Sequence, residues 1–144
     1  MGGNMAQPTA FNYRVKSIVK IIDGDTFDCV LDLGFDVLLE ARVRMMGIDT
    51  PESRTRDKEE KVYGLLAKNW LKKHIDKDII ITTHVNNEKG KFGRILGTVW
   101  KDGVNINEQM IAEGHAVSYH GQNKDDVQAA HMSNRQLLQE KGLV

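Results

Sequence analysis

Five short β-type segments constrain the fold of this chain most strongly, because they are not separated by helices in regular alternation. These segments cover residues 15–22, 27–33, 37–46, 79–85 and 95–100. The first three follow one another through turns rich in Gly and Asp, which is typical of a meander. Without βαβ alternation a parallel sheet is disfavoured. Five short strands of a Greek-key type instead predict a β-barrel with α-helices (α+β), that is, a five-stranded OB-type barrel.

Three helices are expected to pack on this barrel. An apolar stripe at helical spacing, opposite a Lys-rich face, predicts the first helix over about residues 59–75. Asn105, followed by Glu108, resembles a capping box that opens the second helix, and Gly114 suits its end. Asp125 is the expected N-cap of the third helix, whose apolar residues recur on one face.

Length and composition fit a single compact domain. The chain has 144 residues, of which 40% are hydrophobic and 28% charged, as in ordinary globular proteins. We expect a flexible lead-in over residues 1–11, which are small and polar, and one domain over residues 12–144. A hairpin turn is expected at 86–90. Twenty basic residues balance twenty acidic ones, so any anion site must be local.

Cysteine content and hydropathy exclude several classes of protein. The single cysteine, Cys29, excludes an intramolecular disulfide and a Cys-rich zinc site, and its place in an alternating strand favours a buried hydrophobe over a reactive thiol. No apolar run is long enough to span a bilayer, and the N-terminal residues do not resemble a secretory signal. We therefore expect a cytoplasmic protein without membrane association, with secretion left open if the natural N-terminus is longer.

Carboxylates and guanidinium groups concentrate at the ends of predicted strands, within residues 22–26 and 42–52. Carboxylates at a strand end can share a hard cation such as calcium. Arginine suits phosphate because its planar fork presents parallel donors, and a remaining carboxylate can take a proton from water. These groups together fit the cleavage of a phosphodiester.

The same segments also have structural interpretations. Asp-Gly-Asp at 23–25 is common in hairpin turns, and Asp-Thr-Pro-Glu at 49–52 fits a turn with Pro at its second position. Arg42 and Arg44, which alternate along a strand, fit a solvated face. Composition and periodicity leave both interpretations open.

The order of the motifs is more informative than any one of them. Three segments resemble the signature of the staphylococcal nuclease (thermonuclease) family: Ile-Asp-Gly-Asp-Thr at 22–26, Arg-x4-Asp-Thr-Pro-Glu at 44–52 and Lys-Phe-Gly-Arg at 91–94. Tyr63-Gly64 and the stretch 104–114 add to a similarity that runs from about Tyr13 to Leu143. The resemblance implies an OB-type barrel with three helices and a calcium-dependent nuclease that acts on DNA and RNA.

Roles for individual residues follow from this resemblance by position. The metal ligands that it implies are Asp25, Asp49 and the carbonyl group of Thr50. Arg44 and Arg94 would bind the scissile phosphate, and Glu52 would hold the attacking water as a general base. Neutralising the added charge of the transition state would be the main catalytic effect.

Substrate contacts are where this sequence departs from the family. The family's Lys-Tyr-Gly-Arg reads Lys-Phe-Gly-Arg here, so a hydroxyl group near the phosphate is lost and Phe92 can only stack or pack. Beyond Gly114, the family's substrate-side tyrosine has two candidate positions here, Tyr119 and His120. Lys89, Lys91 and Lys124 fit either a local basic rim or solvated turns. The expected substrate-binding residues are Tyr63, Lys91, Phe92, Tyr119 and His120.

One geometric condition must hold for such a site. Arg44 and Asp49 are five residues apart, so in a straight strand their side chains face opposite sides. Both can reach one metal and phosphate only if the chain bends, which Gly47 would permit. A regular strand through Gly47 would contradict the site.

The favoured hypothesis is therefore a monomeric nuclease of low sequence specificity that prefers single-stranded or frayed DNA and RNA. A catalytically inactive OB-fold module that binds nucleic acid or protein is the main alternative. A calcium-binding structural domain would need Asp25 and Asp49 but neither arginine. Four histidines show no ligand spacing and are assigned no role: His74, His84, His115 and His131.

Overall fold

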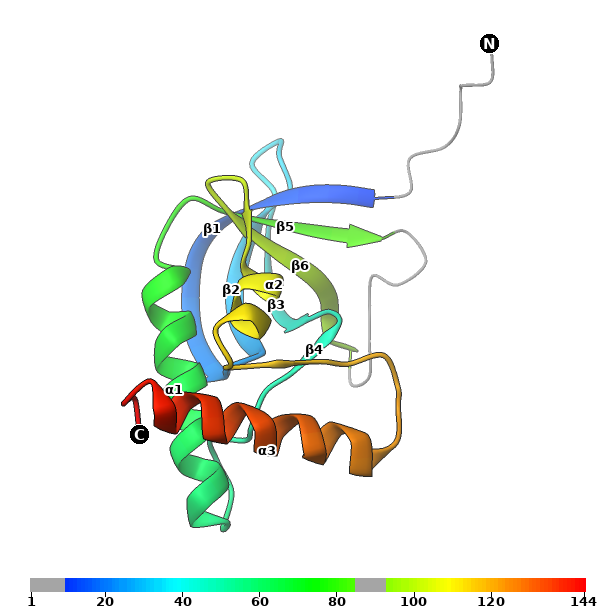
Figure 1. The fold of residues 1–144 in the computed structure, drawn as a ribbon. Coiled ribbons are helices and arrows are strands. Elements are labelled where there is room, and N and C mark those ends of the chain that lie inside the picture. The colour runs from blue at the N-terminus through cyan, green and yellow to red at the C-terminus, as the bar shows by residue number, and fades with distance from the viewer. Residues whose placement is uncertain (1–9, 85–92) are drawn as a thin grey trace.

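The structure is a computed structural model that describes residues 10–84 and 93–144. Within these ranges the chain forms eight strands and three helices (Figure 1). Their order is β1 (Ala10–Asp23), β2 (Thr26–Asp32), β3 (Leu38–Met45), β4 (Ile48–Asp49), α1 (Lys58–His74), β5 (Ile79–His84), β6 (Ile95–Lys101), β7 (Val104–Asn105), α2 (Ile106–Ala112), β8 (Val117–Ser118) and α3 (Lys124–Glu140).

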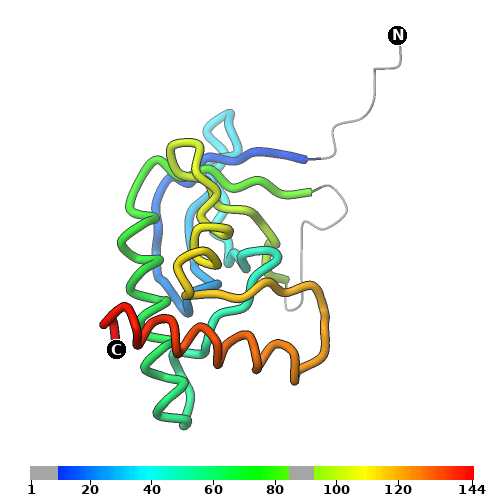
Figure 2. Tube along the Cα trace, viewed as in Figure 1, coloured from blue at the N-terminus to red at the C-terminus, as the bar shows by residue number. Residues whose placement is uncertain are grey.

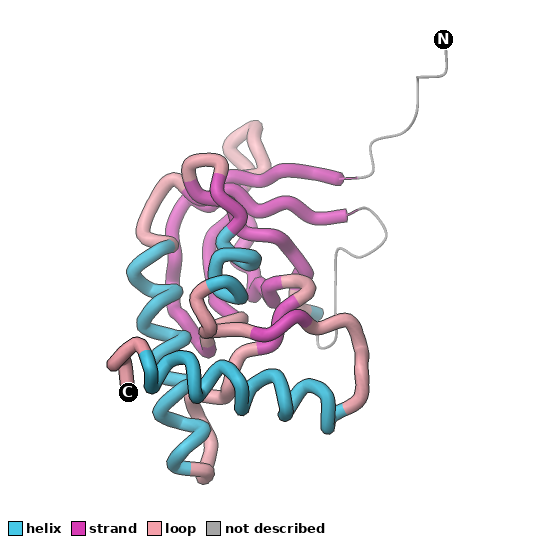
Figure 3. The backbone as a smooth tube through the Cα atoms, viewed as in Figure 1, coloured by secondary structure: helices cyan, strands magenta, loops and turns pink. Residues whose placement is uncertain are grey.

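Five of the strands close into a barrel. The sheet runs in the order β3-β2-β1-β5-β6-β7, and β3 also pairs with β6 in parallel, which closes the first five of these strands into the barrel. The β1–β2 and β2–β3 pairings are antiparallel, as the predicted meander requires. Figure 3 shows the helices around the strands. The predicted fold, an OB-type barrel with three helices, is confirmed.

Strand β1 belongs to two parts of the barrel. Its first half pairs with β5, while from Arg14 onward it pairs with β2, with register shifts at three places. Such bulges bend a strand and increase its twist, so one strand can turn the corner of a small barrel. Ala10 and Phe11 pair with His84 and Thr83. These two residues are therefore in β1 and not in the lead-in expected over 1–11; residues 1–9, and the turn expected at 86–90, lie outside the described ranges.

Alternate residues of the barrel strands point into the core. In β2 the inward positions are Phe27, Cys29 and Leu31, and in β3 they include Val43 and Met45, all of them buried. Burial raises the pKa of the Cys29 thiol to about 12. A thiol with such a pKa is not a nucleophile near neutral pH. The prediction that Cys29 acts as a small buried hydrophobe is confirmed.

The first two helices begin and end close to where the sequence predicts. Helix α1 covers Lys58–His74, one residue earlier than expected, and Asp57 caps it. Asn105 accepts a hydrogen bond from the backbone N of Glu108 and so caps α2. Gly114 follows α2 with a φ of +86°, the left-handed conformation that commonly ends a helix.

The predicted cap of the third helix is wrong. Asn123, with extended backbone, accepts a hydrogen bond from Asp126 N, so α3 begins at Lys124. Asn and Asp are equally good N-caps, and the earlier of the two takes the position. Asp125 instead lies in the first turn, where its negative charge interacts favourably with the positive end of the helix dipole.

Helix α3 lies across one end of the molecule, beside α1 (Figure 2). Gln139 Nε2 donates to Tyr63 Oη at 2.8 Å, and the Arg135 guanidinium lies 5.1 Å from the centre of the Tyr63 ring. The two-residue strands β4 and β8, which the sequence did not predict, pair next to this end of the barrel. None of the helices in the described ranges is long and apolar enough to cross a membrane.

Candidate active site

A sharp bend follows strand β3. The strand ends at Met45, and Gly47 has a φ of +78°, a conformation that costs little for glycine but strains other residues. Asn107 Nδ2, from α2, donates to the Met46 carbonyl at 2.8 Å and holds the bend. The chain then returns as β4. The predicted bend at Gly47 is confirmed.

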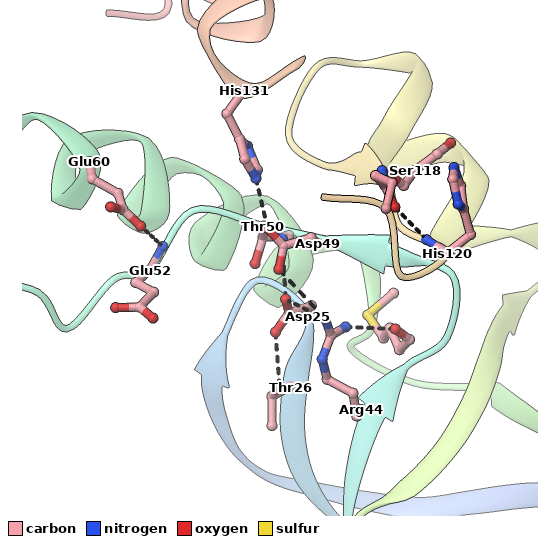
Figure 4. Close-up of polar contacts among 12 residues, drawn as sticks. Asp25, Thr26, Arg44, Asp49, Thr50, Glu52, Glu60, Ser118, His120 and His131 are labelled. Carbon is pink, nitrogen blue, oxygen red and sulfur yellow. Dashed lines mark hydrogen bonds and ion pairs between the residues drawn. The ribbon is translucent and has the colours of Figure 1, made fainter. Parts of the chain in front are cut away.

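The bend places Arg44 between two carboxylates (Figure 4). Its Nη2 lies 3.5 Å from Asp25 Oδ2 and 3.7 Å from Asp49 Oδ1. Its Nη1 donates to the Met45 carbonyl at 2.8 Å, which fixes the guanidinium group. Only 15% of the Arg44 side chain is exposed, so water screens these interactions weakly. Three of the predicted site residues are therefore in one place.

Asp25 is the most tightly held of these groups. It accepts hydrogen bonds from Thr26 Oγ1 at 2.8 Å and from Thr50 N at 3.1 Å. Thr50 is buried, and its Oγ1 has no hydrogen-bond partner among the described residues. Carboxylate oxygens and backbone carbonyl oxygens, such as the predicted carbonyl of Thr50, are the hard donors that calcium prefers. The donor set of Asp25, Asp49 and Thr50 therefore fits calcium in its chemistry.

Glu52 does not join this pair of carboxylates. Its backbone N donates to Glu60 Oε2 of α1 at 2.9 Å, and Figure 4 shows its carboxylate directed away from Asp25 and Asp49. In the described ranges no three Asp, Glu, His or Cys side chains are grouped to hold a metal ion. The third carboxylate lines the same pocket from a separate position.

The loop that carries Glu52 is held from two sides. Ser53 donates from its backbone N to Asp23 Oδ1 at 3.2 Å and from its hydroxyl group to the same atom. On the other side, a Cβ on Gly64 would lie 2.1 Å from the Glu52 carbonyl oxygen. Helix α1 can approach the loop this closely only because residue 64 has no side chain. This contact is a physical reason for the glycine at position 64.

A pocket of about 930 Å³ opens beside Arg44 and Asp49, and Asp25 does not line it. Arg44, Asp49, Thr50 and Glu52 line it, and Arg94 lines it from the segment before β6. Lys124, the first residue of α3, also lines the pocket. Lys89, Lys91 and Phe92 lie outside the described residues. Of the three lysines expected to form a basic rim, the described residues therefore include Lys124 alone.

The two candidates for the position of the family's substrate-side tyrosine, Tyr119 and His120, both line the pocket. Tyr119 is 44% exposed, and its backbone N donates to the Gly47 carbonyl at 2.8 Å. His120 is exposed, and its backbone N donates to Gln122 Oε1. An exposed ring beside a pocket with two arginines is suited to stacking on a base.

Tyr63 lies elsewhere than expected. It is only 5% exposed, packs between α1 and α3, and does not line the pocket. Its hydroxyl group accepts the hydrogen bond from Gln139. The helical stripe to which it belongs faces the interior, and this packing gives Tyr63 a structural place next to Gly64.

His131 is close to the site although its spacing in the sequence gave no indication of this. Its Nε2 lies 2.7 Å from Asp49 Oδ2, and only 10% of its side chain is exposed. The two residues are 82 positions apart. Neither the contact of His131 nor that of Glu60 follows from the sequence, because both depend on where a helix docks.

The sequence of this chain is similar to that of a known protein family. The model of the family described as "Staphylococcal nuclease homologue" matches residues 42–141, well over half of the chain. The chain belongs to this family. The match takes in Arg44, Asp49, Glu52 and Arg94, and it extends through the whole of α3. The family predicted from the three motifs is confirmed.

Three individual proteins are moderately similar in sequence to this chain. The thermonuclease of Staphylococcus intermedius is 33% identical over 105 residues, which cover 73% of this chain and 58% of that protein. The thermonuclease of Staphylococcus hyicus is 30% identical over 105 residues, or 73% and 59% of the two chains. An uncharacterized endonuclease of Escherichia coli is 29% identical over 127 residues, or 88% and 74%. The chain thus spans under two thirds of the length of the thermonucleases.

Proposed function

We propose that this protein is a calcium-dependent nuclease, a phosphodiesterase that hydrolyses DNA and RNA with low sequence specificity. The observation that carries the proposal is the position of Arg44, a largely buried guanidinium beside Asp25 and Asp49 at the wall of an open pocket. Membership of the staphylococcal nuclease family and similarity to a thermonuclease and to an uncharacterized endonuclease support the same activity.

Arg44 and Arg94 are the proposed phosphate-binding residues. Both line the pocket, and a guanidinium fork can donate two parallel hydrogen bonds to phosphate oxygens. Positive charge fixed in advance stabilises the transition state more than the ground state, because the phosphoryl oxygens gain negative charge during attack. Arg44 is suited to this because Met45 and the two aspartates hold it in place before substrate arrives.

Asp25, Asp49 and Thr50 are the proposed calcium-binding residues. When bound, calcium would add positive charge beside the phosphate and order a water molecule. Asp25 belongs to the turn after β1, Asp49 ends β4 and Thr50 follows it, and the bond from Thr50 N to Asp25 connects these two segments. This connection supports the proposal that the three residues bind one ion.

Glu52 is the proposed general base. Its carboxylate lines the pocket, but it points away from the aspartates, so the role requires rotation of the side chain toward an attacking water. Glu60 holds the backbone N of Glu52 during such a rotation. A glutamate side chain can make this change through its χ angles while the loop stays in place.

Tyr119 and His120 are the proposed contacts for the nucleobase, and single-stranded or frayed substrate is the proposed preference. Paired bases are stacked on their neighbours, whereas unpaired bases can stack on an exposed ring. The chain has no net charge, so few phosphate contacts are expected and affinity should fall as salt rises. We further propose that the protein acts as a monomer in the cytoplasm.

The test is cleavage of plasmid and single-stranded DNA with calcium, magnesium or a chelator. We expect calcium to support cleavage, the chelator to abolish it, and magnesium to substitute poorly because it demands a stricter geometry. Glu52→Gln and Asp49→Asn should each lower the rate, whereas Asp32→Asn, at an exposed ion pair with Arg14, should not. Equal cleavage by all variants would indicate a contaminant. Binding of DNA without cleavage by the wild type would favour the inactive OB-fold module.

A further inference from the structure

Asp49 is held differently from its partner Asp25. Asp25 is 8% exposed and accepts two hydrogen bonds from its own surroundings, the hydroxyl group of Thr26 and the backbone of Thr50. Asp49 ends the two-residue strand β4, and a third of its side chain is exposed. Within the described ranges its hydrogen bond comes from His131 of α3, at 2.7 Å. The orientation of this carboxylate therefore depends on α3.

The surroundings of the His131 imidazole determine which of its two nitrogens carries the hydrogen. His131 Nδ1 is buried and has no hydrogen-bond partner in the part of the chain that the structure describes. A proton on Nδ1 would be a buried donor without an acceptor, which is costly, whereas a bare Nδ1 leaves only an acceptor unused. The N–H is therefore at Nε2, and His131 donates to Asp49 Oδ2.

The two oxygens of Asp49 thus have separate partners. Oδ2 accepts from His131, and Oδ1 lies 3.7 Å from Arg44 Nη2, toward Asp25. A carboxylate that binds a metal ion is commonly oriented by a hydrogen bond to its second oxygen. The bond to Oδ2 prevents rotation that would turn Oδ1 away from Asp25.

Helix α3 is anchored so that His131 keeps this position. Asn134 Nδ2 donates to the Ala116 carbonyl at 3.1 Å, one helical turn after His131. Farther along, Gln139 donates to Tyr63 Oη. These contacts fix the helix to β8 and to α1, so the imidazole is held by packing and not only by Asp49.

We propose that His131 is a positioning residue for the metal site: it donates Nε2–H to Asp49 Oδ2 and so keeps Oδ1 in place as a ligand. The proposal rests on the proposed function, since it assigns a partner to one of the proposed calcium ligands. It makes the C-terminal helix part of the site, although α3 supplies none of the predicted metal ligands or catalytic residues.

The experiment compares two substitutions of similar length. His131→Gln keeps an N–H that can reach Asp49, and His131→Met fills similar space without a donor. Calcium alone is titrated into each full-length protein by calorimetry, and the calcium concentration for half-maximal cleavage is measured separately. We expect His131→Met to weaken calcium binding about 10- to 100-fold and His131→Gln to restore most of it. Gln136→Leu, which removes an exposed hydrogen bond to Glu140 within the same helix, should leave calcium binding unchanged.

Each outcome decides between the two proposals. If Asp49→Asn abolishes calcium binding but His131→Met does not change it, the metal site stands and the role of His131 is wrong. A loss in the Met variant that Gln does not restore also overturns that role. If the wild type binds no calcium, the proposed metal site fails and the role of His131 fails with it. Circular dichroism without calcium monitors folding; should His131→Met and a second donor-free variant, His131→Ala, both fail to fold, His131 belongs to folding and the proposal is overturned.

Discussion

Arg42 and Arg44 are the same residue type on the same face of β3, yet they have opposite surroundings. Arg42 pairs with Asp28 through two hydrogen bonds and keeps half of its side chain exposed. Arg44 is 15% exposed and lies between Asp25 and Asp49. The solvated strand face that the sequence allowed for both describes only Arg42.

The chain beyond β3 makes the difference. After Met45 the bend at Gly47 brings β4 back over Arg44, while nothing comparable covers Arg42 in the described ranges. Surface ion pairs contribute little because water screens them, whereas a covered pair is held in a fixed geometry. Alternation along a strand therefore decides which face a residue is on, and the path of later segments decides whether that face becomes a site.

The largest expected effect is on cleavage by variants of these two arginines. Arg44→Ala should lower kcat by about 10²–10³-fold, the usual cost of losing one donor to the transition state. Arg42→Ala should stay within about threefold of the wild type, because an exposed pair such as Arg42–Asp28 has little influence elsewhere. Initial rates on single-stranded DNA in calcium measure both. Similar losses in the two variants would remove the contrast between the two positions.

The bend itself is tested by Gly47→Ala. Gly47 and Gly103 share a φ of +78°, and neither would bring a Cβ within 4 Å of another atom, so Gly103→Ala is a matched control. Each substitution should cost roughly 1–2 kcal/mol of stability, because an L-residue is strained there. Only Gly47→Ala should also lower cleavage, by about 10- to 100-fold, since it displaces Asp49 from Arg44. Equal rates for the two variants would show that the bend does not set the site geometry.

The same contrast should be visible in the salt dependence of binding. With the Glu52→Gln protein, affinity for single-stranded DNA should fall with salt with a slope near −0.7 for each phosphate contact. Adding Arg44→Ala should reduce the slope by about 0.7, and adding Arg42→Ala should leave it unchanged. Fluorescence anisotropy over a salt series measures this. A slope that does not respond to Arg44→Ala would place the phosphate elsewhere.

The smallest expected effect concerns the covered and exposed histidines. Burial lowers the pKa of His115 below its ordinary value of 6.5; Lys141 and His74 add to the shift, and Glu113 opposes it. As pH falls below about 6.5, the unfolded chain binds a proton that the folded chain does not, so the free energy of unfolding decreases. Above that range both states are neutral and the effect vanishes.

Urea unfolding between pH 8 and pH 5.5 measures this effect. His115→Gln should lose part of the decrease at low pH, because its side chain does not titrate. His120→Gln is the control: His120 is exposed, so the pH dependence should remain as in the wild type. An unchanged pH dependence in His115→Gln would show that another group carries it.

Much of the fold could be predicted because the signals are local. Alternating residues predicted the barrel strands, and the Asn105 cap and Gly114 set the limits of α2. The bend at Gly47 was also predictable, since Arg44 and Asp49 have opposite parity and glycine permits the left-handed conformation. Asp125 was a poorer prediction because two good capping residues compete within three positions. The short strands β4 and β8 carry too few residues for any periodicity.

The sequence by itself determined the family, the barrel and which residue types can bind phosphate and calcium, because these depend on short motifs, alternation and side-chain chemistry. Only the tertiary structure decided that Tyr63 is buried, that the Glu52 carboxylate points away, and that His131 contacts Asp49. These contacts depend on how α1 and α3 dock on the barrel. Docking is set by packing between segments up to 82 residues apart, for which a single sequence carries no local signal.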